Sequence, residues 1–278
     1  MNDLSIIIVN WNTRQLLHEC LISIYRQTTG LSYEVIVVDN HSSDGSPDMV
    51  GQDFPQVHLI RNTENTGFSH ANNQALRYAS GRYLLLLNSD TAITENSFQP
   101  MADFMDAHPS VGIAGTRLLN PDGSHQYSYD AFPRKPLTMM WEKFIQILSL
   151  HGDGELNQST PQKKVYENFF VDYVIGAVLL IRRETFEQIG MLDEKFFMYA
   201  EDIDWCYRAA QAGWQTAYLG TLSVYHYNQG SSKKSPEQSS RLQGMRTESL
   251  IKFYRKHYGW LNALLFRLIL CLQALKGQ

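Results

Sequence analysis

A carboxylate ends an apolar run at residues 83–87, and its position suggests metal chemistry. The run contains four consecutive leucines without polar alternation, which is typical of a strand buried on both faces of a parallel sheet. Asn88, Ser89 and Asp90 follow at its carboxyl end, where open α/β sheets bind ligands. Asp90 is therefore expected to hold a divalent metal that binds a diphosphate. The alternative is that Asp90 caps the next helix, because Asp is a favoured N-cap.

Three carboxylates fall within four residues later in the chain, at Glu201, Asp202 and Asp204. A helix over 201–212, ended by Gly213, would place them in its first turn, where acidic side chains interact favourably with the helix dipole. That is the structural interpretation. The functional interpretation is that one of them is a general base whose pKa is tuned by partial burial among aromatic and apolar neighbours.

His226 is the third candidate for chemistry, because it directly precedes a polar segment at 228–240. A single histidine is most often structural. A metal ligand at the hinge of a closing loop would, however, let loop closure and binding of the metal–diphosphate support each other.

The elements that must position these residues alternate between strand and helix. Short β-branched or leucine-rich runs at 4–9, 33–38, 57–60 and 83–87 predict buried strands, with helical patterns between them. This alternation predicts a parallel sheet with right-handed crossovers, so the polar clusters that end the strands should share one edge. The residues expected there are Asn10 and Asn12, Asp39 and Asn40, Asn62 and Asn65, and Asn88 and Asp90.

The remaining patterns predict further elements. A helix is expected over 97–108, a strand over 111–115, one long strand over 169–181 with Gly176 inside it, and a helix over 183–189. Strands are expected at 216–219 and 222–227, and an apolar helix over 137–150 precedes a polar loop at 151–164. Gly176 marks either the close approach of a ligand or a bend.

The ligand expected at this edge is a nucleotide whose phosphates are not bound by either of the common glycine-rich phosphate-binding motifs. No GxGxxG follows the first strand, and no GxxxxGK[ST] phosphate loop occurs. A metal on Asp90 would then neutralise the phosphates. Asp39 would accept a hydrogen bond from a pyrimidine ring N–H, since an ionised carboxylate only accepts; the alternative is an Asx-turn.

Composition restricts the partners and the location. With 44% hydrophobic residues, 19% charged residues and a net charge of -4, the chain is globular, and nucleic acid is not an expected partner. We expect a cytoplasmic protein, because the N terminus lacks a basic signal region, no run of 18 apolar residues occurs and the three cysteines show no disulfide or metal spacing.

The C-terminal tail has a different charge from the rest of the chain. From Ser231 onwards there are nine basic and two acidic residues, and residues 247–275 carry an apolar stripe at helical spacing that Gly259 divides into two helices. Such a segment favours contact with an anionic membrane surface, here the inner face of the cytoplasmic membrane. The alternative is a pair of helices packed on the catalytic domain or in a dimer.

Read in order, these short motifs resemble the family 2 glycosyltransferases, and within them the rhamnosyltransferase-like branch. The resemblance runs over 4–227 and rests on Asn10-Trp11-Asn12, the cluster at Asp39, residues 65–73, Asn88-Ser89-Asp90 and Glu201-Asp202. It implies a GT-A fold, which is an α/β, Rossmann-like, mostly parallel sheet flanked by helices, here with a C-terminal helical tail. It also implies a nucleotide-sugar donor, a Mg or Mn ion and inversion at the anomeric carbon.

The resemblance assigns roles by position. Asp90 matches the last residue of the metal-binding DxD element, which here reads Asn-Ser-Asp and lacks the first carboxylate, and His226 matches a late metal ligand. Asp202 matches the catalytic base. The positions that match substrate-binding residues are Asn10, Asp39, Gly67, Asn72, Asn73, Asn88 and Glu201.

The expected organisation has three parts: a nucleotide-sugar-binding half at 1–115, an acceptor-binding and catalytic half at 116–230, and a basic loop with amphipathic helices at 231–278. The expected reaction moves a hexosyl or deoxyhexosyl group, with rhamnose as one candidate, from a dTDP- or UDP-linked donor to a glycan or polyprenyl-linked acceptor, as in bacterial cell-surface polysaccharide synthesis. One alternative is a non-catalytic nucleotide-sugar binder. Another is a nucleotidyltransferase, which would need a second metal carboxylate and a basic loop near the first strand, where only Arg14 is available.

Overall fold

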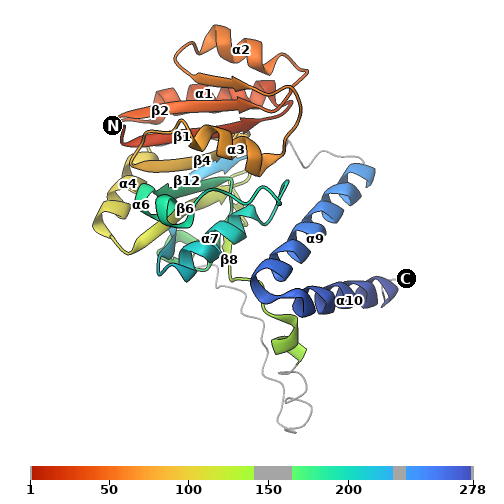
Figure 1. The fold of residues 1–278 in the computed structure, drawn as a ribbon. Helices are drawn as coiled ribbons and strands as arrows, with labels where there is room; N and C mark the ends of the chain where they lie inside the picture. Colours follow the sequence, from red (N-terminus) through yellow and green to blue (C-terminus); the bar gives the residue numbers. More distant parts are fainter. Residues whose placement is uncertain (1, 141–164, 228–235, 277–278) are drawn as a thin grey trace.

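The computed structural model describes residues 2–140, 165–227 and 236–276, which form one mixed sheet covered by helices on both faces and two further helices at the C terminus (Figure 1). Within these ranges no helix combines the length and the apolar character needed to cross a bilayer. The predicted helix at 137–150 is described only as far as residue 140, and the predicted loop at 151–164 lies outside the described residues.

The first half of the sheet is parallel, as the strand and helix alternation predicts. Its strands pair in the order β3-β2-β1-β4, and the register places Asn10 opposite Asp39 and Val9 opposite Asn88. The polar strand ends are therefore level with one another. The elements are β1 (Leu4–Asn10), α1 (Arg14–Gln27), β2 (Tyr33–Asp39), α2 (Ser46–Asp53), β3 (His58–Arg61), α3 (Phe68–Leu76) and β4 (Tyr83–Asn88).

The second half extends the sheet through one reversed strand. The order continues from β4 to β11, β6, β12 and β5, with β11 antiparallel to both of its neighbours and β6 parallel to β12. Because β11 is reversed, its first residues lie at the carboxyl end of β4. The elements are β5 (Thr91–Ala92), α4 (Phe98–Ala107), β6 (Val111–Leu119), β7 (His125–Gln126), β8 (Tyr129–Asp130), β11 (Val178–Arg182), α6 (Arg183–Ile189), α7 (Glu201–Gln211) and β12 (Gln215–His226).

Two strand predictions in this half are wrong. The single strand predicted over 169–181 is three strands, β9 (Asn168–Val171), β10 (Tyr173–Val174) and β11, because β9 pairs with β12, β10 pairs with β8, and only β11 enters the sheet beside β4. The two strands predicted at 216–219 and 222–227 are one, since β12 continues through an irregularity between Leu219 and Ser223. An apolar run does not show which partner each of its parts pairs with.

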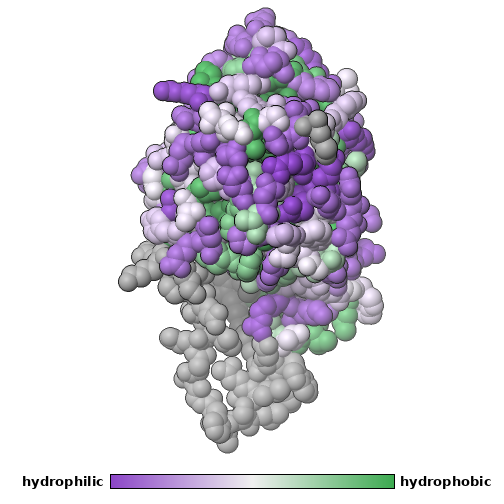
Figure 2. Space-filling model, turned by 90° about the vertical axis from the view of Figure 1, so that its left-hand side faces the viewer, coloured by the Kyte–Doolittle hydropathy of each residue, from purple (hydrophilic) through white to green (hydrophobic). Residues whose placement is uncertain are grey.

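Both faces of the sheet are buried, which explains the unbroken apolar strands. Leu85 and Leu87 pack on one face with α1, α2 and α4, while Leu84 and Leu86 pack on the other face with α3, α6 and α7. Successive strand residues point to opposite faces, so each strand contributes to two cores. The side that carries the N terminus is mainly hydrophilic, with apolar residues only in small groups (Figure 2).

Two helices end the chain, α9 (Pro236–Tyr258) and α10 (Trp260–Lys276). The predicted break at Gly259 is confirmed, and its φ of 85° is readily adopted only by glycine. The polar loop predicted over 228–240 is wrong from residue 236 onwards, where α9 already begins, and its first part lies outside the described residues. Phe253 of α9 is buried in the core that includes α7, whereas α10 packs on α9 through Tyr254 and Phe266, whose ring centroids are 4.5 Å apart.

We expect the β4 side chains to control stability. Replacing the fully buried Leu85 by Ala should lower the free energy of unfolding by about 2–5 kcal/mol, because it removes buried methyl groups and leaves a cavity. Ile22→Ala on α1 is the control: this side chain is 46% exposed, and a change within about 0.5 kcal/mol is expected. Urea unfolding of both variants measures this; equal losses would contradict the assignment of β4 to the core.

Candidate active site

The predicted metal ligands Asp90 and His226 lie side by side at one edge of the sheet. The short strand β5 pairs antiparallel with the end of β12, which places His226 opposite Thr91, and the N–H of Tyr227 donates to the carbonyl oxygen of Asp90 at 2.8 Å. The backbone ladder thus carries the side chains together, with Nε2 of His226 3.2 Å from Oδ1 of Asp90. Both residues are buried.

The chemistry of this pair fits a divalent cation. A carboxylate oxygen and an imidazole nitrogen are common ligands of such ions in proteins. No group of three or more His, Cys, Asp or Glu residues that could hold a metal occurs in the described part of the chain. The protein would therefore supply two ligands of these types, and water or phosphate oxygens would complete the coordination.

Asn10 and Asp39 form a second cluster beside this pair. The amide of Asn10 donates to Oδ1 of Asp39 at 2.8 Å, and the backbone N–H of Ser42 donates to Oδ2 of Asp39 at 2.9 Å. Each carboxylate oxygen keeps a second acceptor position, which suits a donor group on a ligand. The Ser42 contact is also the turn that the alternative interpretation of Asp39 predicts.

One hydroxyl links this cluster to the metal pair. Thr13 donates from Oγ1 to Oδ1 of Asn10 at 2.6 Å, and the same atom lies 2.9 Å from Oγ of Ser89, the neighbour of Asp90. The sequence carries no signal that marks Thr13 as a site residue, because a threonine before a helix is common without any ligand.

The segment at 65–73 is held by its own hydrogen bonds. Oδ1 of Asn40 accepts hydrogen bonds from the Asn62 amide and from the Thr66 N–H. Nδ2 of Asn40 donates to Oδ1 of Asn65 and to the Gly67 carbonyl. These residues were predicted to be neighbours, and they are. Their polar groups mainly satisfy one another, which makes this part of the edge a preorganised loop.

Gly67 and Asn73 of this segment contact residues 192–197. A Cβ atom on Gly67 would lie 2.7 Å from the Phe197 carbonyl oxygen, and the N–H of Phe68 donates to that oxygen at 2.7 Å. Asn73 donates to the Leu192 carbonyl at 2.9 Å and accepts from its N–H at 3.0 Å. Asn72 is buried, and its Oδ1 has no partner in the described residues. Their donor-binding role stays a prediction.

Asp202 lies at the same edge of the sheet as Asn88. The N–H of Asn88 donates to the carbonyl of Ala177 at 3.0 Å, and the N–H of the preceding residue, Gly176, donates to Oδ2 of Asp202 at 3.0 Å. Asp202 is thus a neighbour of Gly176, but its approach does not require glycine, since a Cβ there would lie 3.5 Å from the Asp202 Cβ, an ordinary van der Waals distance. Two strand ends therefore connect the predicted base to the predicted metal ligands.

Burial raises the pKa of the Asp202 carboxyl above its ordinary value. Hydrogen bonds from the N–H groups of Gly176 and Ile203, and the positive charge of Arg246, oppose the rise. Asp202 nevertheless remains partly exposed at the start of α7. A partly exposed carboxylate with a raised pKa is well suited to accept a proton from a hydroxyl.

The other two carboxylates of α7 have different surroundings. Glu201 is buried, burial together with the charge of Asp202 raises its pKa well above the ordinary value, and Oε2 has no partner in the described residues. Asp204 has no exposed surface and accepts hydrogen bonds from His257 at 2.7 Å and from Arg208 at 2.9 Å, with the Lys256 ammonium also 2.7 Å away.

These contacts of Asp204 attach α9 to α7. Despite the cost of burial, the hydrogen bond from His257 and the charges of Arg208 and Lys256 hold the pKa of Asp204 at about 2. The structure thus separates three carboxylates that the sequence presented as equivalent: Asp202 faces the site, Glu201 lies beneath it, and Asp204 holds the C-terminal helix.

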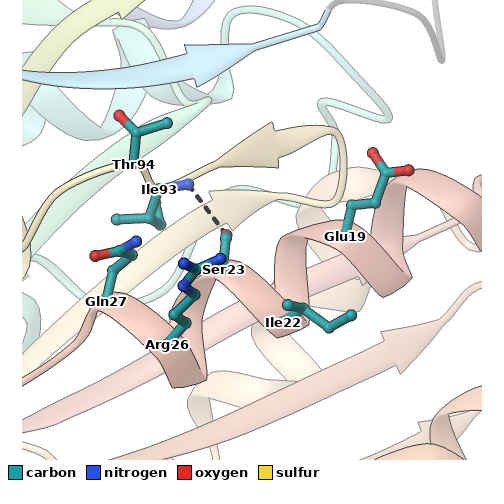
Figure 3. Close-up of a pocket in the computed structure, with 7 residues that line it drawn as sticks. All are labelled: Glu19, Ile22, Ser23, Arg26, Gln27, Ile93 and Thr94. Carbon is teal, nitrogen blue, oxygen red and sulfur yellow. Dashed lines mark hydrogen bonds between the residues drawn. The ribbon is translucent and has the colours of Figure 1, made fainter.

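A groove of about 330 Å³ lies elsewhere, between α1 and the residues that follow β5 (Figure 3). Ser23 accepts a hydrogen bond from the Ile93 N–H there at 3.0 Å. None of the predicted site residues lines this groove, so it is separate from the site. Its lining residues are Glu19, Ile22, Ser23, Arg26, Gln27, Ile93 and Thr94.

Comparison with known protein families identifies the family to which this chain belongs. Residues 5–190 match the family model described as glycosyl transferase family 2. The chain belongs to this family. The family resemblance read from the motifs is thereby confirmed, and the chain is a glycosyltransferase. The match ends before Asp202 and His226, so their placement rests on the geometry described above.

Curated proteins align with most of the chain at modest sequence identity. It is 25% identical over 256 residues to the N-acetylglucosaminyl-diphospho-decaprenol L-rhamnosyltransferase of Mycobacterium tuberculosis, covering 82% of this chain and 77% of that protein. It is 30% identical to the low-salt glycan biosynthesis hexosyltransferase Agl10 of Haloferax volcanii, and the alignment covers 81% of this chain and 67% of Agl10. The first of these relatives agrees with the predicted rhamnosyltransferase-like branch.

Solved structures confirm the predicted GT-A fold. The glycosyltransferase aligns with the mannosyltransferase PcManGT of Pyrobaculum calidifontis, solved with GDP-Man and Mn2+, with a TM-score of 0.61 and 20% identity. The alignment covers 92% of this chain and 64% of the mannosyltransferase. At this identity the likeness concerns the fold alone.

We predict that Asp204 controls acid stability. Its folded pKa of about 2 lies below the ordinary value of 3.8, so its contribution is complete above about pH 4 and is lost as the pH falls toward 2. Asp204→Asn should cost about 2 kcal/mol of unfolding free energy at pH 7 and reduce the loss that the parent chain shows between pH 5 and pH 3.

Urea unfolding at pH 7, 5, 4 and 3 measures this difference. Asp103→Asn is the matched control, because Asp103 is exposed and, within the described residues, its side chain hydrogen-bonds to Gln99 of its own helix alone. If the Asp204 variant and the parent chain lose stability in parallel over this pH range, Asp204 does not hold α9 in this way.

Proposed function

We propose that this glycosyltransferase is a metal-dependent, inverting enzyme. It moves a hexosyl or deoxyhexosyl group, with rhamnose as the leading candidate, from a dTDP- or UDP-linked donor to a hydroxyl of a glycan or polyprenyl-linked acceptor. The observation that carries the proposal is that the Asp90–His226 pair follows the carboxyl end of β4, and that Asp202 accepts a hydrogen bond from the Gly176–Ala177 turn, which contacts Asn88 at that same end. The relatives named as rhamnosyltransferases support the choice of sugar.

On the donor side, Asp90 and His226 would hold Mg2+ or Mn2+. When bound, the ion supplies positive charge to the diphosphate as the bond to the sugar breaks. Asn10 and Asp39 would bind the nucleoside through the acceptor positions that their mutual hydrogen bond leaves open. Mn2+ is the first ion to test, because the structurally similar mannosyltransferase was solved with it.

On the acceptor side, Asp202 would take the proton from the attacking hydroxyl. Its raised pKa makes it a stronger base than an ordinary carboxylate. The two backbone N–H groups that bind its oxygens hold the carboxylate in one orientation. Attack from the face opposite to the leaving diphosphate gives inversion in a single displacement, without a covalent sugar–enzyme intermediate.

The proposal is tested with the full chain, Mn2+ or Mg2+, and a panel of dTDP-, UDP- and GDP-sugars. A donor-specific rise in Tm should identify the donor, and release of the nucleoside diphosphate should report transfer. Asp202→Asn should reduce transfer by about 10²–10⁴-fold while the donor-dependent rise in Tm persists, since general-base catalysis contributes that much. Asp103→Asn, on the distant helix α4, should transfer at the parent rate.

Other outcomes would favour the alternatives. Donor binding without any turnover across the acceptor panel would favour the non-catalytic binder, and release of pyrophosphate would indicate a nucleotidyltransferase. Substantial residual transfer by the Asp202 variant would remove Asp202 from the role of base.

A polyprenyl-linked acceptor would bring the enzyme to a membrane surface, and α10 offers a suitable contact. The inner side of α9 packs on the domain, as the packing alternative expects, but the outer side of α10 is left exposed. Trp260 is 70% exposed, and leucines at intervals of four residues continue the stripe. Exposed basic residues such as Arg255 and Arg267 suit anionic headgroups. The exposed leucines at these intervals are Leu264, Leu268 and Leu272.

Flotation of the full chain with vesicles tests this contact. We expect recovery with anionic vesicles and much less with zwitterionic ones. Replacing all three exposed leucines by Gln should abolish flotation without lowering Tm, whereas Ile22→Gln on the opposite part of the molecule should float like the parent. Unchanged flotation of the triple variant would rule out α10 as the membrane contact.

A further inference from the structure

The nitrogen of His226 that faces away from Asp90 has its own partner. Nδ1 of His226 lies 2.6 Å from Oε1 of Gln126, the last residue of β7. β7 pairs antiparallel with β6, which places Gln126 opposite Leu118. Gln126 was not among the residues that the sequence motifs identified.

Two further contacts fix the orientation of the Gln126 amide. Nε2 donates to Oδ1 of Asn120 at 2.8 Å and to the backbone carbonyl of His226 at 3.2 Å. Asn120 is oriented in turn, because its own Nδ2 donates to Oγ of Ser124 at 2.9 Å and leaves Oδ1 as an acceptor. Since both neighbours of Nε2 are acceptors, the amide oxygen must be the atom that faces Nδ1 of His226.

The protonation pattern of the imidazole follows from this orientation. An amide oxygen only accepts, so Nδ1 carries the hydrogen. In the neutral ring Nε2 then keeps its lone pair. That nitrogen lies 3.2 Å from the Asp90 carboxylate and 3.2 Å from the Asn88 amide nitrogen, which donates to it. Two electron-rich atoms, Nε2 and Oδ1 of Asp90, thus face the same space.

We propose that Gln126 is a positioning residue for the metal site: its amide oxygen holds His226 in the Nδ1–H tautomer and aims Nε2 as a ready ligand beside Asp90. The inference rests on the proposed function, because it takes the Asp90–His226 pair as the cation site. Outer hydrogen-bond partners of this kind commonly change metal affinity by about 10–100-fold.

A different role for Gln126 would be to brace the turn at 120–124 through its amide N–H groups alone. Two variants separate these roles. Gln126→Leu removes both the acceptor and the donors at similar size. Gln126→Glu keeps an acceptor oxygen for Nδ1 but loses both N–H donors, so only the positioning role predicts that it is tolerated.

The test is titration of Mn2+ into the full chain saturated with UDP or dTDP, whichever binds, followed by calorimetry or electron paramagnetic resonance. Gln126→Leu should weaken Mn2+ binding by about 10–100-fold, and Gln126→Glu should bind within about threefold of the parent. Equal weakening in the two variants, or none in either, would overturn the proposal. Tm values show whether each variant is folded.

A second readout does not depend on the metal. Ring nitrogen shifts of 15N-histidine-labelled protein, with His226 assigned from a His226→Asn variant, report the tautomer in the metal-free chain. The parent and Gln126→Glu should show Nδ1–H, and Gln126→Leu should show a mixture or Nε2–H. An Nε2–H tautomer in the parent would overturn the proposal.

The Mn2+ titration and the tautomer measurement distinguish failure of the Gln126 proposal from failure of the proposed function. If His226→Asn binds Mn2+ like the parent, the cation site is not at this pair. The tautomer measurement still decides whether Gln126 sets the state of His226.

Discussion

The site depends on a two-residue ladder between β5 and the end of β12. Its register places His226 opposite Thr91, and the Tyr227 N–H closes on the Asp90 carbonyl. Residues separated by more than a hundred positions in the chain are thereby fixed at side-chain contact distance. Without this pairing, neither residue alone would form a metal site, because a single carboxylate or imidazole binds such ions weakly.

The reversed strand β11 brings the other half of the site to the same place. Because β11 runs antiparallel to β4, its first residues lie beside the last residue of β4. The turn at Gly176 and Ala177 then contacts Asn88 on one side and Asp202 on the other. A fully parallel sheet would have placed this turn at the opposite edge, away from the polar loops that follow β1, β2 and β4.

The first of the C-terminal helices, α9, is tied to the helix that carries the proposed base. The contacts of Lys256 and His257 with Asp204 join α9 to α7, which begins at Glu201, and Ser249 of α9 donates to the Met198 carbonyl at 2.9 Å. The segment between Met198 and α7 includes Tyr199 and Ala200, both with positive φ. Since such backbone conformations persist only where the surroundings hold them, α9 helps to fix the segment that leads to Asp202, the proposed base. A membrane contact through α10 would thus act on an element next to the chemistry.

The amino-acid sequence by itself determined the family, the alternation of strands and helices, and the identities of Asp90, Asp202 and His226 as residues to examine. These follow from periodicity and from the order of short motifs, which are local properties of the chain. The sequence also gave the break at Gly259, since glycine tolerates the positive φ there.

Only the tertiary structure decided how residues 169–181 divide among three partners, which of the three α7 carboxylates faces the site, and that Gln126 contacts His226. The physical reason is the same in each case. A strand's pairing, a carboxylate's pKa and a histidine's tautomer are set by atoms contributed from distant positions, and no local pattern records which groups those will be.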